Sequence, residues 1–147
     1  MPLYAIARIA KQKGGSIASS SHHNDRTRET LNVDPARLGQ NRLLIGEDRN
    51  VRELVTEVID VHGGKPRSDS VEVVEMVLTA TPTFFRHEHG EIDQKMLDRF
   101  VERAVVFLKA PGSGGICVKA VLHLDKQTPH IQAHKLPAAS VACLLRD

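Results

Sequence analysis

The segment HLDKQTPHIQAH, residues 123–134, holds three of the chain's eight histidines together with a glutamine. Imidazole nitrogens and amide oxygens can both bind divalent cations. In a β-strand, side chains two positions apart lie on the same face, so His130, Gln132 and His134 would point the same way. His123 would share a face of the preceding strand with Asp125. The spacing therefore predicts a cluster of ligating groups on a short hairpin.

A hairpin that closes over residues 125–128 would place His123 opposite His130. Opposite residues in such a pair have Cβ atoms about 4.5–5.5 Å apart. His123, His130 and Gln132 would then form a site for a divalent ion with open positions, where a substrate oxygen can bind. Asp125 is a candidate for orienting one imidazole from behind. The alternative is that these histidines only solvate an exposed sheet face.

A second polar segment, SHHNDRTRE at residues 21–29, also has the residue types for chemistry on phosphate. Arginine suits bidentate phosphate contact, which makes Arg26 a candidate. His22 or His23 could act as a base, or as a nucleophile that forms a phosphohistidine. The alternative is a hydrophilic loop, or a helix start capped by an Asn or Asp side chain.

Hydrophobic periodicity indicates the elements that must position these groups. Apolar residues at helical spacing predict amphipathic helices, whereas β-branched and alternating patterns predict strands. The Gly/Ser-rich stretch KQKGGSIASSS predicts a basic loop. The order of these strands and helices along the chain predicts an α+β domain, an antiparallel sheet with helices packed on one face. The helices are residues 48–62 and 92–109, the strands are residues 3–9, 71–80, 116–124 and 129–136, a short edge strand lies within 33–46 around RLLI, and the loop is 11–21.

Composition limits the class of protein. A length of 147 residues fits one domain with a real core. Aromatic residues make up only 3%, which disfavours a base-stacking platform. The net charge of +2 is compatible with a nucleic-acid partner but does not require one. Two cysteines without C-x-x-C spacing, no signal peptide and no long apolar run predict a cytoplasmic protein without a membrane span.

Three stretches together resemble the Pre/Mob plasmid recombination proteins, the MobV class of plasmid mobilisation relaxases. The opening YAIARIAKQK followed by GG is similar to the family's first strand and basic loop. HHNDR is similar to its H-N-x-R motif, and HLDKQTPHIQA to its third motif, H-x-D-E-x-T-P-H-x-H, where Gln also occurs at the last position. The resemblance implies a histidine-hydrophobe-histidine (HUH) endonuclease fold, an antiparallel sheet flanked by helices.

Residue by residue, the resemblance assigns His23 to the histidine of H-N-x-R as candidate nucleophile, with the adjacent His22 as alternative. Arg26 falls on the motif's arginine and would contact phosphate. Tyr4, the sole tyrosine, is a further candidate nucleophile, although a packed strand residue is the simpler interpretation.

The third motif carries over to the metal site. His123, His130 and Gln132 fall on the metal triad, with Asp125 on the motif's aspartate. The implied cofactor is Mn²⁺ or Mg²⁺, which would polarise the scissile phosphate.

The resemblance implies a function for residues 1–147, interpreted as a relaxase domain that is incomplete at its C-terminus. It would be a bacterial, cytoplasmic, metal-dependent endonuclease that nicks one strand of plasmid DNA at the transfer origin, stays joined to the 5′ phosphate and later reseals the strand. The partner would be origin DNA, read as a hairpin with adjacent single strand. The alternatives are a DNA-binding remnant without nuclease activity and a metal-binding protein with no nucleic-acid role. The sequence sets neither the origin nor the oligomeric state.

Overall fold

The computed structural model describes residues 5–12, 41–61, 73–110, 115–125 and 128–137. Within them, five strands form one sheet in the order β1-β3-β5-β4-β2, and every neighbouring pair is antiparallel. The α+β prediction is therefore confirmed. The strands are β1 Ala5–Gln12, β2 Arg42–Ile45, β3 Val73–Ala80, β4 Gly115–His123 and β5 His130–Pro137, and the helices are α2 Val51–Val61, α3 Gln94–Lys109 and a 3₁₀ turn at Pro82–Phe85.

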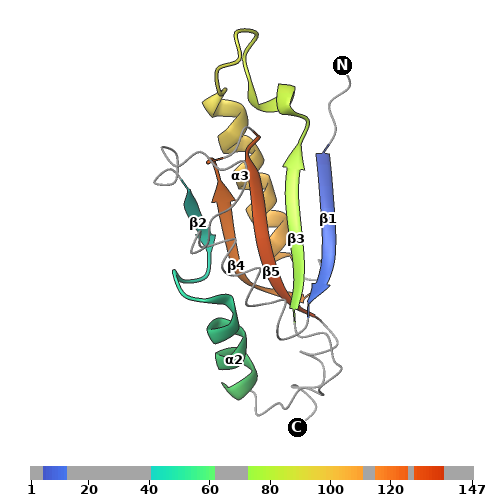
Figure 1. Ribbon diagram of the computed structural model, residues 1–147, viewed down its shortest axis with the longest axis vertical. Coiled ribbons are helices and arrows are strands. Elements are labelled where there is room, and N and C mark those ends of the chain that lie inside the picture. Colours follow the sequence, from blue (N-terminus) through green and yellow to red (C-terminus); the bar gives the residue numbers. More distant parts are fainter. Residues whose placement is uncertain (1–4, 13–40, 62–72, 111–114, 126–127, 138–147) are drawn as a thin grey trace.

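The main core lies between one face of the sheet and α3, which lies behind the sheet in Figure 1. Asp93 caps α3 just before its first residue, and its side chain accepts a hydrogen bond from the Met96 amide. Apolar side chains at helical spacing along α3 meet alternate residues of the three central strands. The fully or nearly buried members of this core include Phe85, Leu97, Leu108, Leu122, Ile131 and Ala133.

The helix α2 packs on the sheet face opposite α3. A smaller apolar cluster there joins Val51 and Val55 of α2 to Val73 of β3 and Leu136 of β5. Val73 is an odd-numbered residue of β3, whereas the β3 members of the main core are even-numbered, so the two sets point to opposite faces. The expectation that both helices pack on one face is therefore wrong. Amphipathic periodicity identifies a helix but does not indicate which face of the sheet it covers.

The first strand runs further than its composition indicates. Residues 11 and 12 were expected to begin the basic loop, but they continue β1 by pairing with Val74 and Val73 of β3. β1 is an edge strand, and its residues 5–10 are all exposed. Backbone pairing with a longer neighbouring strand can extend a strand beyond the residues whose composition predicts it, because the ladder hydrogen bonds join main-chain groups. The predicted RLLI edge strand is confirmed as β2, the opposite edge of the sheet.

Candidate metal centre on the β4–β5 hairpin

The two histidines of the hairpin face each other across neighbouring strands, as the period-2 argument predicts. His123 is the last residue of β4 and pairs directly with His130, the first residue of β5. Their rings stack with centroids 5.0 Å apart and planes inclined by 24°. The hydroxyl of Thr79 on β3 donates a 2.8 Å hydrogen bond to the Pro129 carbonyl and so ties the hairpin to the sheet. The two imidazoles are therefore held side by side at the end of the two central strands.

The Nδ1 edge of each ring faces other protein groups. His130 Nδ1 lies 3.2 Å from the Thr128 carbonyl oxygen, so a proton on Nδ1 is favoured and Nε2 keeps its lone pair. His123 Nδ1 lies 3.9 Å from a carboxylate oxygen of Asp125, and both side chains are fully buried. It also lies 3.4 Å from the side-chain nitrogen of Asn41. A histidine that binds metal through Nε2 usually donates its Nδ1 proton to a neighbouring oxygen. The Thr128 carbonyl is placed to accept it from His130, whereas Asp125 lies beyond hydrogen-bond distance of His123.

Gln132 is the third predicted donor. It is two residues beyond His130 on the same face of β5, it is 3% exposed, and it pairs with Val121 and Val77 of the adjacent strands. Among the residues that the structure describes, no three His, Cys, Asp or Glu side chains come together as a metal cluster. The third side-chain donor of the predicted set is therefore the Gln132 amide. Two imidazoles and one amide oxygen form a set that suits Mn²⁺ and similar borderline ions.

The same face continues away from the hairpin as a buried polar row. His134 is fully buried, and its Nε2 lies 3.8 Å from a carboxylate oxygen of Glu75 on β3. Lys119, opposite His134 on β4, is also buried and donates a 2.7 Å hydrogen bond to the Arg49 carbonyl before α2. His134 was expected on this face, whereas no sequence pattern predicted the burial of Lys119, whose neighbours in β4 are apolar.

Asn41 is the other residue that sequence reasoning missed. It lies just before β2, 82 positions from His123, and no motif or period marks it. Its side-chain oxygen accepts a 2.8 Å hydrogen bond from the Leu124 amide, immediately after β4.

The predicted nucleophile segment cannot be compared with this geometry. Tyr4, His22, His23 and Arg26 lie outside the described residues. Their roles stay predictions from the sequence.

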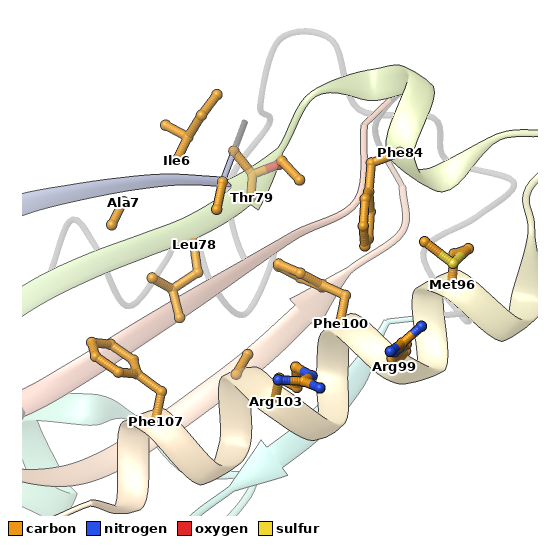
Figure 2. Close-up of a pocket in the computed structure, with 13 residues that line it drawn as sticks. Ile6, Ala7, Leu78, Thr79, Phe84, Met96, Arg99, Phe100, Arg103 and Phe107 are labelled. Atoms are coloured by element: carbon orange, nitrogen blue, oxygen red, sulfur yellow. The ribbon is translucent and has the colours of Figure 1, made fainter. Parts of the chain in front are cut away.

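A separate apolar groove lies between β1, β3 and α3 (Figure 2), with a volume of about 540 Å³. Phe84, Phe100 and Phe107 line it, and Arg99 and Arg103 of α3 lie along it (Figure 2). Its helix wall belongs to α3, which covers the sheet face opposite His130 and Gln132. The groove is therefore not part of the histidine site.

In the described part of the chain, neither helix has the length and apolar character needed to span a bilayer.

The chain is similar to known proteins in sequence and in fold. The family model described as plasmid recombination enzyme (Mob_Pre) matches residues 1–142. A plasmid recombination enzyme of Streptococcus agalactiae is 29% identical, over 91% of this chain and 28% of that protein. A 65 kDa protein of Zymomonas mobilis is 30% identical, over 93% of this chain and 24% of that protein. The chain thus spans about a quarter of the length of these two relatives.

Among solved structures, the chain is similar to the MobM relaxase domain bound to plasmid pMV158 oriT DNA, in a Mn-bound crystal structure. The TM-score is 0.73 and the identity 25%, over 93% of this chain and 76% of that one. The fold match confirms the predicted antiparallel sheet flanked by helices. The match of the family model over nearly the whole sequence shows that this chain belongs to the Mob_Pre family of plasmid recombination enzymes.

Proposed function

We propose that this chain is the DNA-nicking domain of a plasmid mobilisation relaxase, a metal-dependent site-specific endonuclease and transesterase. The observation that carries the proposal is the direct pairing of His123 with His130, with Gln132 next along the same face. This set occupies the third-motif positions of a family whose related relaxase domain is described as Mn-bound and bound to oriT DNA.

In this proposal His123, His130 and Gln132 hold Mn²⁺ or Mg²⁺ and Asp125 orients His123. A divalent ion at this place supplies Lewis-acid polarisation of a phosphate oxygen. Imidazole favours Mn²⁺ over Mg²⁺, because Mg²⁺ prefers oxygen ligands.

The strand transfer itself would use the early polar segment. His23 of that segment, with His22 or the first-strand Tyr4 as alternatives, attacks the scissile phosphorus, and Arg26 contacts the phosphate. The bond from phosphorus to the 3′ oxygen breaks, which leaves a 3′-hydroxyl and a protein joined to the 5′ phosphate. Attack by that hydroxyl reverses the step and reseals the strand. The partner is plasmid origin DNA.

The test uses the purified chain and a supercoiled plasmid carrying the origin DNA that flanks its coding sequence, with and without Mn²⁺. We expect relaxation and a covalent protein–DNA adduct in Mn²⁺ only. Both should be lost in His130→Ala, and the adduct should be lost in His23→Ala. His134→Gln is the matched control, because His134 is a buried histidine of the same strand outside the donor set.

Retardation of origin DNA without cleavage would contradict the nuclease and favour a DNA-binding remnant. Metal affinity without salt-dependent DNA binding would contradict both, since a DNA-binding protein loses affinity as salt rises.

A further inference from the structure

Asn41 contacts the candidate metal centre from the chain just before β2, outside the sequence motifs. It lies before β2, at the sheet edge next to β4, and its side chain reaches the point where β4 ends. Its amide oxygen accepts the Leu124 N–H at 2.8 Å, and its amide nitrogen lies 3.4 Å from His123 Nδ1. One side chain therefore contacts both the ring of a proposed ligand and the backbone that follows it.

The Leu124 contact fixes which way the amide points. A backbone N–H is a donor only, so the Asn41 atom at 2.8 Å must be the oxygen. The –NH₂ group then faces His123, and it can donate to Nδ1 only when the ring carries its proton on Nε2.

A metal bound through Nε2 needs the other tautomer, with the proton on Nδ1. The group placed to accept that proton is Asp125, whose carboxylate oxygen lies 3.9 Å from the same nitrogen. Asn41 and Asp125 thus face one ring atom with opposite hydrogen-bonding character. The Asn41 donor suits the metal-free ring with its proton on Nε2, and the Asp125 acceptor suits the ligating ring with its proton on Nδ1.

We propose that Asn41 is a positioning residue for His123: it anchors the end of β4 and holds the metal-free ring in place by donating to Nδ1. The inference rests on the proposed function only in taking His123 as a metal ligand. It adds a residue outside the three motifs and assigns it a defined hydrogen-bonding role.

The first experiment reads the tautomer directly in metal-free protein labelled with ¹⁵N-histidine. At neutral pH, long-range ¹H–¹⁵N spectra should show His123 protonated on Nε2. In Asn41→Asp, which offers Nδ1 an acceptor instead of a donor, the proton should move to Nδ1. A wild-type ring protonated on Nδ1 would overturn the proposal, whether or not the protein binds metal.

The second experiment measures Mn²⁺ affinity from the electron paramagnetic resonance signal of free Mn²⁺. Asn41→Ala removes the anchor that holds the end of β4 and should lose about 10-fold in affinity, the low end of the cost of removing a group that supports a ligand. The loss is limited because the variant also lacks the donor that favours the metal-free tautomer. Asn41→Asp should bind at least as tightly as wild type, because a carboxylate keeps the Leu124 contact and accepts from the Nδ1 proton.

Asn50→Ala is the matched control. Asn50 also accepts a 2.8 Å hydrogen bond from a backbone amide, that of Arg52, but it lies at the start of α2. It should keep wild-type affinity. Equal affinities for the two alanine variants would overturn the proposal. If Asn41→Ala does not fold, Asn41→Asp decides, and a tenfold loss there would overturn it too. A wild-type protein that fails to bind Mn²⁺ contradicts the proposed function instead, and the tautomer spectrum then decides the role of Asn41.

Discussion

Ile131 and Ala133 on one face of β5, and Gln132 and His134 on the other, are all almost inaccessible to solvent, yet their surroundings differ. The first pair packs into the apolar core beneath α3. The second pair lies in a polar row that continues from His130 at the hairpin. A buried polar group is costly unless it has partners, whereas a buried isoleucine is stabilised by burial itself.

The two faces of β5 therefore have different roles. Burial on the α3 face supplies free energy that keeps β5 in the middle of the sheet. The same strand holds the proposed ligands His130 and Gln132 in register on its other face. Burial alone does not distinguish the two, since both are closed to solvent. Substitutions on the α3 face should therefore change stability, and those of the proposed donors His123, His130 and Gln132 on the other face should change metal binding.

The largest effect is expected on the α3 face. Ile131→Ala removes a fully buried side chain from the main core and should lower the free energy of unfolding by about 2–5 kcal/mol. Urea denaturation monitored by circular dichroism measures it. Mn²⁺ affinity of the folded fraction should be unchanged, and a tenfold weaker affinity would show that the two faces are not separable.

On the histidine face, His123→Ala removes one of two imidazoles from the donor set. Mn²⁺ affinity should fall by at least about 100-fold, equivalent to about 2.7 kcal/mol. Calorimetric titration of wild type and variant measures the change. An exposed histidine, His89→Ala, is the control and should bind as wild type. Equal affinities for His123→Ala and wild type would place the metal elsewhere.

A smaller effect is expected where β2 approaches β4. Gly46 has φ +85°, and a Cβ there would collide with the Val118 carbonyl oxygen. Gly90 has φ +86° with nothing within 4 Å of an added Cβ, so it is a matched control for backbone strain alone. Because of this clash, Gly46→Ala should cost about 1–3 kcal/mol more than Gly90→Ala, measured by thermal unfolding. Equal costs would mean that β2 can move away from β4.

The smallest effect concerns Cys117, which packs beside the main core on the α3 side of β4. Burial raises the pKa of its thiol from the ordinary 9.0 to about 11. At pH 8 its thiolate fraction is then about 100-fold below that of the unfolded chain, and thiol labelling in a Cys143→Ser background should be slow. Because the thiol ionises at lower pH in the unfolded chain than in the folded protein, rising pH favours the unfolded chain. The stability contributed by the protonated Cys117 thiol is therefore complete below pH 9 and is lost as pH rises from 9 to 11. Rapid labelling of folded protein at pH 8 would contradict the burial of Cys117.

The hairpin register could be predicted because it depends on short-range rules. Period-2 alternation and the distance between His123 and His130 along the chain are enough to place the two rings opposite each other, once Thr128 and Pro129 close a turn. The order of strands and helices along the chain could be predicted for the same reason.

The rest depends on contacts between distant parts of the chain. Asn41 meets His123 across 82 residues, and the extension of β1 through Lys11 depends on pairing with β3. The face on which α2 packs depends on which strand residues are left for it after α3 has covered the other side. Local patterns do not encode these choices.

The central claim is that His123 and His130 bind one divalent ion together. Electron spin-echo modulation of Mn²⁺ bound to protein labelled with ¹⁵N-histidine tests it most directly, because each coordinated imidazole nitrogen modulates the echo. The account predicts two coupled histidine nitrogens in the wild type and one in either His123→Ala or His130→Ala at saturating Mn²⁺. Bound Mn²⁺ without histidine coupling, or coupling unchanged in both variants, would contradict it.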